Sequence, residues 1–129
     1  MPGILEAVAR GVLEHRRLAL ELGPTGAFPN LGGGRVVWVG VRGDTEALLR
    51  LQSSVEQAVQ RAGFEAEPRT FRPHITLGRA KKGLAFSLPH NVAALDPVPV
   101  QVDRLTLMAS DLKPGGAVYT SLGVAALYC

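Results

Sequence analysis

The sequence has almost no cysteine and no long apolar run. Cys129 is the only cysteine among 129 residues, which excludes an internal disulfide framework and a metal site built from several cysteines. The longest apolar stretches, such as 118–127, are interrupted by polar residues or glycine, and no segment has the length of a membrane span. The N-terminus shows no basic segment leading into an apolar run, so no secretory signal is expected. These absences predict a cytoplasmic protein with no membrane partner.

Aromatic residues are also scarce, at 5% of the chain. Proteins that bind single-stranded nucleic acid without sequence preference stack successive bases on several aromatic side chains. The low aromatic content therefore argues against an extended stacking platform. We expect Trp38 and Phe71 to pack in the core instead.

Carboxylates are missing from the interval between Glu67 and Asp96. The cations in this interval are Arg69, Arg72, Arg79, Lys81 and Lys82. A basic stretch without acids raises the local potential and favours a phosphate-bearing partner. The alternative is an ordinary solvated surface, and a formal net charge of +3 does not decide between the two.

The rest of the composition is that of one folded domain, 1–129. Apolar residues make up 47% of the chain, which is long enough to bury its own core, and no linker divides it. Periodicity predicts helices over 4–17 and 44–62 and strands over 18–22, 35–41, 70–79, 98–110 and 117–127. Gly23-Pro24 is expected to end the first strand, and Lys113 to Gly116 to form a hairpin turn. This order predicts an α+β fold, with helices on antiparallel sheets.

The segment "FRPHITLGRA", 71–80, carries the chemistry. Alternate side chains of a strand share a face, so Arg72, His74 and Thr76 are expected to project together, and Phe71, Ile75 and Leu77 into the core. A fixed cation, a group that titrates near neutral pH and a hydroxyl are what is needed to hold a phosphodiester and move a proton. The alternative is the ordinary polar face of a half-exposed sheet.

Other candidate motifs are weaker. Gly32 to Arg35 lacks the Gly-Lys-Ser/Thr ending of a phosphate-binding loop. His15 is expected at the surface near a helix end, and His90 in a loop. No carboxylate pair stands at metal-ligand spacing with a histidine, so no metal site is expected.

The motif resembles the second H-x-T-x signature of the two-histidine phosphoesterase superfamily, in the branch of bacterial RNA 2',3'-cyclic phosphodiesterases, also called 2'-5' RNA ligases. The segments "GAFPN", "RVVWVGV" and "LTLMASDLKPGGAVYTSL" follow in the order of that branch, so the resemblance covers essentially the whole chain. It implies two α/β lobes, each presenting one H-x-T-x strand to a shared basic cleft. It implies an enzyme that hydrolyses RNA 2',3'-cyclic phosphate ends to 2'-phosphomonoesters, perhaps with reversible 2'-5' ligation, and requires no metal or nucleotide cofactor.

Carried over residue by residue, the resemblance assigns catalysis to His74 and Thr76 and substrate binding to Arg72 and Tyr119. His74 would accept a proton in hydrolysis, and Thr76 would bind a non-bridging phosphate oxygen. Arg72 would hold the phosphate or the polynucleotide backbone. Tyr119 matches the aromatic position of the final strand. The expected partners are RNA ends or small cyclic nucleotides.

The sequence departs from the family in having one H-x-T, because Arg-Arg follows His15 and Asn-Val follows His90. We expect the first lobe, about 1–41, to lack its motif strand and the second, about 42–129, to be complete. The unpaired sheet edge of such a chain would favour a homodimer that brings two His74 side chains to one cleft. The alternative is a non-catalytic module that binds RNA ends or phosphate.

Overall fold

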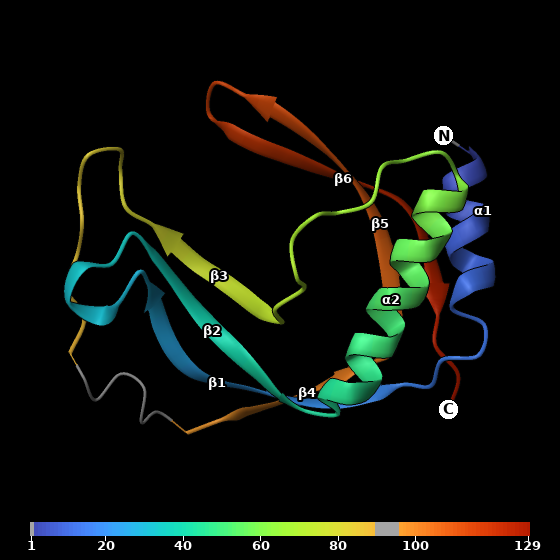
Figure 1. The fold of residues 1–129 in the computed structure, drawn as a ribbon, viewed down its shortest axis with the longest axis horizontal. Coiled ribbons are helices and arrows are strands. Elements are labelled where there is room, and N and C mark those ends of the chain that lie inside the picture. Colours follow the sequence, from blue (N-terminus) through green and yellow to red (C-terminus); the bar gives the residue numbers. More distant parts are fainter. Residues whose placement is uncertain (1, 90–95) are drawn as a thin grey trace. The chain divides into compact units, whose positions relative to one another are not determined.

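The computed structural model describes residues 2–89 and 96–129. Over these residues the chain is α+β, with two α-helices and antiparallel strand pairs, which confirms the predicted fold class (Figure 1). The elements are α1 (Pro2–Gly11), β1 (Leu18–Phe28), the 3-10 turn η1 (Leu31–Gly33), β2 (Val36–Gly43), α2 (Thr45–Arg61), β3 (His74–Arg79), β4 (Val98–Val102), β5 (Arg104–Lys113) and β6 (Gly116–Ala126). Neither helix is long and apolar enough to cross a membrane.

The chain divides into two compact units, and both are assembled from separated segments. Unit 1 consists of Met1–Leu18, Glu46–Thr70 and Val102–Cys129, and unit 2 of Ala19–Thr45 and Phe71–Gln101. The expected lobes, 1–41 and 42–129, are continuous stretches, and that assignment stays a prediction. In the structure, each compact unit is instead formed by contacts between segments that lie far apart in the sequence.

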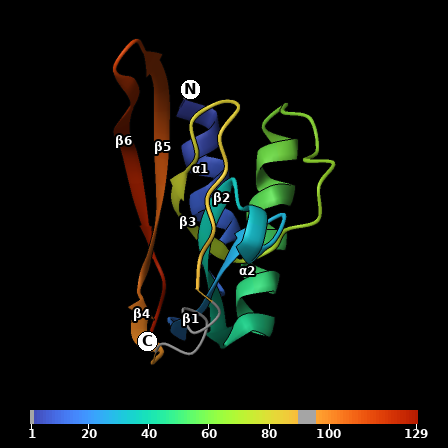
Figure 2. The ribbon, with the colours of Figure 1, turned by 90° about the vertical axis from the view of Figure 1, so that its left-hand side faces the viewer.

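Unit 1 packs α1, α2 and the β5–β6 hairpin around an apolar core. The predicted helix over 44–62 is confirmed as α2, and Leu51 and Ala58 form its buried stripe. The core also takes in Val8, Val12, Leu18, Ala125 and Leu127. The predicted hairpin is confirmed too, and Figure 2 shows β5 and β6 running side by side as a long ribbon. Gly123 lets α1 approach this ribbon, since a Cβ there would lie 2.5 Å from the side chain of Leu5.

The first helix is shorter than predicted and ends at Gly11 instead of Arg17. The backbone beyond it pairs with the C-terminal segment: Arg17 N–H donates to the carbonyl of Tyr128, and Tyr128 N–H donates to that of His15. These long-range hydrogen bonds satisfy backbone groups that a continued helix would have used.

Unit 2 contains a four-stranded sheet in the order β3-β2-β1-β4. The prediction that Gly23-Pro24 ends the first strand is wrong, because β1 continues to Phe28. The register shifts between Leu22 and Thr25, where β1 has one residue more than β2. Pro24 has no N–H to donate, and an irregularity of this kind is where a strand tolerates that loss.

The predicted strand over 98–110 is two strands in the structure. β4 joins the sheet of unit 2, whereas β5 pairs with β6 in unit 1, and Asp103 lies between them. Apolar alternation runs through both strands, so the pattern alone does not show where the chain leaves one sheet for the other.

Candidate active site

The motif strand β3 begins at His74, so Arg72 and Pro73 precede it. The prediction of a strand from Thr70 is therefore wrong at its start. Pro73 has no N–H for the ladder, which disfavours strand pairing at this position. The expectation that Phe71, Ile75 and Leu77 face the core is also wrong, because all three are exposed. No α-helix among the described residues of unit 2 covers that face of the sheet.

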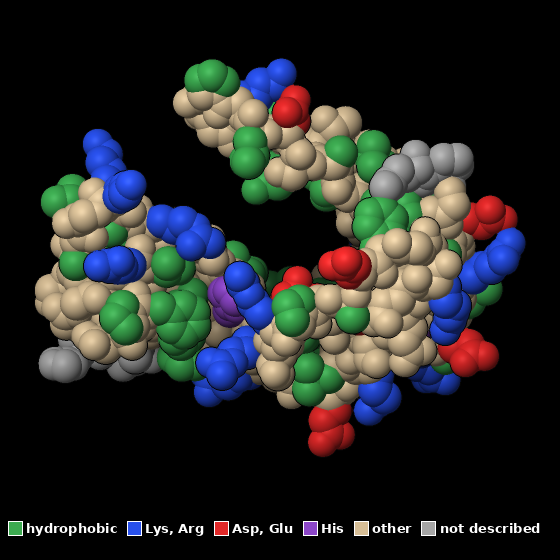
Figure 3. All heavy atoms as spheres, turned by 45° about the horizontal axis from the view of Figure 1, so that its top comes forward, with side chains coloured by type: hydrophobic (Ala, Val, Ile, Leu, Met, Phe, Trp, Pro, Cys, Tyr) green, Lys and Arg blue, Asp and Glu red, His purple; other side chains and the backbone are tan. Residues whose placement is uncertain are grey.

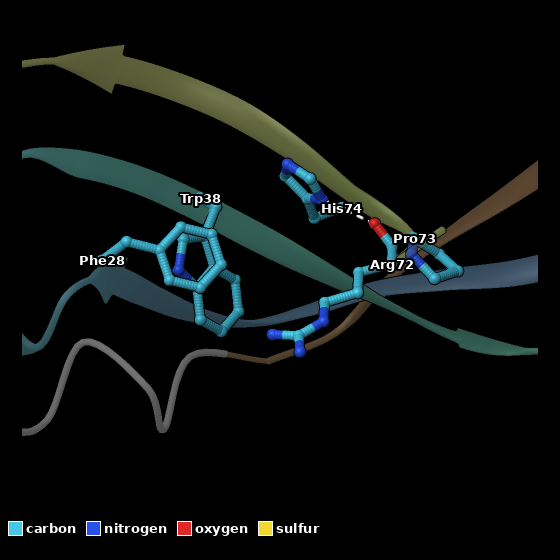
Figure 4. A pocket seen from close by; sticks show the side chains of 5 residues that line it. All are labelled: Phe28, Trp38, Arg72, Pro73 and His74. Carbon is cyan, nitrogen blue, oxygen red and sulfur yellow. Dashed lines mark hydrogen bonds between the residues drawn. The ribbon is translucent and has the colours of Figure 1, made fainter. Parts of the chain in front are cut away.

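The imidazole of His74 is held by the backbone just before it. Its Nδ1 lies 2.6 Å from the carbonyl oxygen of Arg72 (Figure 4). A carbonyl oxygen only accepts, so Nδ1 carries the hydrogen in this contact. In the neutral ring the lone pair is then on Nε2, which forms no hydrogen bond with a described residue. The exposed His74 thus presents a nitrogen that can accept a proton.

A pocket of about 260 Å³ lies beside this imidazole. It is lined by Phe28, Trp38, Arg72, Pro73 and His74 (Figure 4). All five belong to unit 2, but they come from the end of β1, from β2, and from His74 with the two residues that precede β3. The pocket therefore joins a cation and an imidazole to two aromatic rings.

The aromatic wall of the pocket depends on a glycine. Trp38 lies opposite Gly26 across β1 and β2, and a Cβ on Gly26 would come within 2.4 Å of the indole. The Phe28 ring lies 5.3 Å from the Trp38 ring, centroid to centroid, and 6.1 Å from the imidazole in an edge-on arrangement. Trp38, which was expected to pack in the core, is half-buried and also lines the pocket.

The sheet register shows which side chains share the face of His74. His74 pairs with Gly40 and Thr76 with Trp38, so both motif side chains lie on the face of the indole, as predicted. Thr76 lies two residue pairs further along the sheet and does not line the pocket.

Arg79 joins this face because of an irregularity in β3. The pairing passes from Trp38 with Thr76 to Val37 with Gly78, which leaves Leu77 as an extra residue. Arg79 then pairs with Val36, two residues from Trp38 and on the same face. Strict alternation from His74 puts Gly78 on this face and Arg79 on the other, so the sequence pattern missed it.

The net positive charge of the chain lies on unit 2, the unit that carries the pocket. By sequence, unit 2 has six Lys and Arg residues and three carboxylates, whereas unit 1 has eight of each. The whole formal charge of +3 is thus on unit 2. In Figure 3 Lys and Arg side chains are prominent on the part that carries β1 to β3. An anionic ligand is favoured there by the field of several cations.

The remaining candidates lie elsewhere. Tyr119 is exposed on β6, opposite Ser110, and belongs to unit 1. His15 is half-buried and not fully at the surface, and its Nε2 lies 2.8 Å from Ser54 Oγ. His90 lies outside the described residues. Within the described ranges, no group of three His, Cys, Asp or Glu side chains is placed to hold a metal ion.

Known proteins share this sequence and fold. The RNA 2',3'-cyclic phosphodiesterase of Aeropyrum pernix is 36% identical over 116 residues, covering 85% of this chain and 65% of the relative. That of Thermus thermophilus is 36% identical over 125 residues, covering 85% and 59%. The chain thus spans less than two thirds of the length of these relatives.

Solved structures resemble the fold along nearly its whole length. E. coli LigT complexed with 3'-AMP superposes with a TM-score of 0.73 and 26% identity, covering 98% of this chain and 67% of that one. The protein TT0787 of Thermus thermophilus gives a TM-score of 0.71 and 28% identity, covering 98% and 69%. The family description "2'-5' RNA ligase superfamily" matches residues 1–114. The chain belongs to the 2'-5' RNA ligase superfamily.

Proposed function

We propose that this chain hydrolyses 2',3'-cyclic phosphodiester ends of RNA, or small cyclic nucleotides, to 2'-phosphomonoesters. The observation that carries the proposal is the orientation of His74, whose Nδ1 is tied to the Arg72 carbonyl so that Nε2 is left to accept a proton. The relatives named RNA 2',3'-cyclic phosphodiesterase support the same reaction.

Each motif residue has a role in the proposed reaction. Nε2 of His74 takes a proton from the attacking water, and the water oxygen forms a bond to phosphorus. The bond between phosphorus and the 3' oxygen breaks, and that oxygen leaves with a proton. The Thr76 hydroxyl donates to a non-bridging oxygen, and the Arg72 guanidinium neutralises the charge that develops on the phosphoryl group. Arg79 reaches the same face and would bind a neighbouring phosphate.

The proton for the leaving oxygen needs a second donor. The chain has one H-x-T motif, and one positioned acid or base contributes about 10²–10⁴ in rate. A second copy could supply the missing imidazole, because β3 is an edge strand of its sheet within the described residues and can pair with another strand. In that case hydrolysis per chain rises with protein concentration as dimers form. Activity per chain that stays constant across the monomer–dimer transition, followed by sedimentation, rules the dimer out.

The reaction is tested with 2',3'-cyclic AMP and the purified chain. Phosphorus NMR distinguishes the 2'-monoester from the 3'-monoester, so it reports both the rate and the bond that breaks. We expect the 2'-monoester from the wild-type chain and none above background from His74→Ala. Formation of the 3'-monoester, or equal rates in both proteins, contradicts the proposal.

A module that binds phosphate without turnover is the second candidate, and the single H-x-T motif favours it. It predicts salt-sensitive binding of RNA 3' ends with no product, because the Arg72 and His74 contacts remain while proton transfer is incomplete. Binding of an RNA with a cyclic phosphate end, measured alongside the hydrolysis assay, separates the two.

A further inference from the structure

The sheet face that carries the pocket continues past it in two directions. On β2, alternate residues share this face, which runs from Val36 through Trp38 to Arg42. Arg79 pairs with Val36 at one end of the face, and Arg42 lies at the other end, two residues beyond the partner of His74. An RNA whose 3' terminal phosphate is in the pocket can therefore leave it toward either arginine.

The two ends of this face differ in charge. Glu21 pairs with Arg42 across β1 and β2, so a carboxylate shares the face at that end. The Arg79 end is formed by the end of β1, the start of β2 and the end of β3, and neither 22–43 nor 68–95 contains Asp or Glu. A polyanionic chain is therefore attracted to the Arg79 end without repulsion from a neighbouring carboxylate.

Two lysines at the same end of the sheet are carried on a turn that the backbone holds in place. Lys81 and Lys82 are exposed, and the carbonyl of Lys81 accepts a hydrogen bond of 2.9 Å from Leu84 N–H. Phe86 and Gly34, just before β2, then exchange two backbone hydrogen bonds of 2.8 and 2.9 Å. A Cβ on Gly34 would lie 2.4 Å from the Phe86 ring, so this ring packs on bare glycine backbone. The turn is thus ordered without a ligand, which lowers the entropic cost of binding one.

We infer that Arg79, Lys81 and Lys82 bind the RNA backbone on the 5' side of the terminal phosphate, so that the site selects oligonucleotides over mononucleotides. This inference rests on the proposed function. His74 and Arg79 are five positions apart on β3, and strand residues advance about 3.3 Å each, so their backbones lie roughly 15 Å apart. A stacked strand advances about 3.4 Å per nucleotide, so about four or five nucleotides cover this distance, and fewer do so when the strand is extended.

The test measures the affinity of oligouridylates of increasing length that end in a 2'-phosphate, by calorimetry. This end is the proposed product, so binding requires no turnover. We expect the affinity to rise by about tenfold up to about four or five nucleotides, and then to level off, because no further cation is reached. Arg79→Gln and the double variant Lys81→Gln/Lys82→Gln should each flatten this rise and leave the affinity for 2'-UMP nearly unchanged.

Arg42→Gln is the matched control, because it removes one charge from the same face at the opposite end. It should leave the dependence on length intact. An affinity that does not depend on length, or a rise that is lost in Arg42→Gln and kept in Arg79→Gln, overturns the inference. Circular dichroism checks that each variant is folded.

Failure of the proposed function gives a different result. An oligouridylate with a 3'-hydroxyl end should bind more weakly than one of equal length with a 2'-phosphate. Equal affinity for the two ends contradicts the proposed function, whereas a dependence on length that Arg79→Gln removes still supports the backbone site. Preference for the phosphate end without dependence on length keeps the proposed function and overturns the inference.

Discussion

The two units differ in burial and in charge, which suggests a division between stability in unit 1 and the proposed binding in unit 2. Seven of the nine buried apolar residues in the described part of the chain belong to unit 1, which has no net formal charge. Unit 2 has the remaining two, the whole net charge of +3, the pocket and His74. Charged and aromatic groups that stay accessible to a ligand cannot also be buried to stabilise the fold, so the two requirements favour different surfaces.

The largest effect that tests this division is loss of the imidazole in unit 2. His74→Ala is expected to lower kcat/KM for 2',3'-cyclic AMP by about 10²–10⁴, because it removes the positioned base. The melting temperature should change little, since the side chain is exposed. His15→Ala, in unit 1, is the control and should leave hydrolysis unchanged. The division fails if the two variants lose activity equally.

A change in the core of unit 1 should instead lower the stability of the fold. Leu51 is 3% exposed on α2, and Leu51→Ala is expected to lower the free energy of unfolding by about 2–5 kcal/mol through lost burial and a cavity. Leu49 lies on the same helix but is 44% exposed, so Leu49→Ala should cost less than about 1 kcal/mol. Urea unfolding measures both values. Similar losses in the two variants would show that α2 does not bury the stripe described.

Tyr119 tests whether substrate binding is confined to unit 2. It lies in unit 1, although the family resemblance assigns it to substrate binding. If the assignment is right, Tyr119→Ala weakens binding of 2'-AMP by about tenfold, the amount expected for loss of one aromatic contact with a base. Tyr119→Phe distinguishes the ring from the hydroxyl. Unchanged affinity in both variants would leave substrate binding to unit 2 alone.

Arg79 tests whether the positive charge of unit 2 contacts RNA. Arg79→Gln should reduce the slope of log affinity against log salt by about 0.7 for a single-stranded RNA, because one fewer phosphate is neutralised. Arg61→Gln removes an equal charge from the end of α2 and should leave the slope unchanged. Titrations at several salt concentrations decide between the two. An unaltered slope for Arg79→Gln would mean that this side chain does not contact the RNA.

The smallest expected effect is a pH dependence at Asp103. A hydrogen bond from Arg104 Nε, at 2.9 Å, lowers the pKa of the Asp103 carboxyl from its usual value. A pKa that is lower in the folded state contributes stability above the ordinary value of about 4, and that contribution is lost as the pH falls through the folded pKa. Asp103→Asn should therefore lose less stability than the wild type on acidification below about pH 4. Parallel curves from thermal unfolding at several pH values would contradict this.

Local patterns predicted several elements correctly, and long-range pairing decided the rest. The apolar spacing in α2 and the turn between β5 and β6 are properties of a few neighbouring residues, and both were predictable. The end of α1 at Gly11 was not, because it depends on pairing of 15–17 with Tyr128. Continuation of β1 past Pro24 likewise depends on β2, which supplies the partner groups.

Prediction from local sequence has the same limit at the candidate site. Alternation placed His74 and Thr76 on one face, and the register confirms it. The extra residue at Leu77 moves Arg79 to that face, and no local feature of "HITLGR" shows where a strand loses its register. Phe28 was missed because it lies far from the motif in the sequence and reaches the pocket only through pairing of β1 with β2.

The sequence by itself determined the α+β class and the shared face of His74 and Thr76, because periodicity acts over a few residues. Its resemblance to known motifs indicated the family. Only the tertiary structure decided which segments form each unit, which rings line the pocket and which nitrogen of His74 is left to accept a proton. These features depend on hydrogen-bond pairing and packing between distant segments, whose free energy no local stretch of sequence contains.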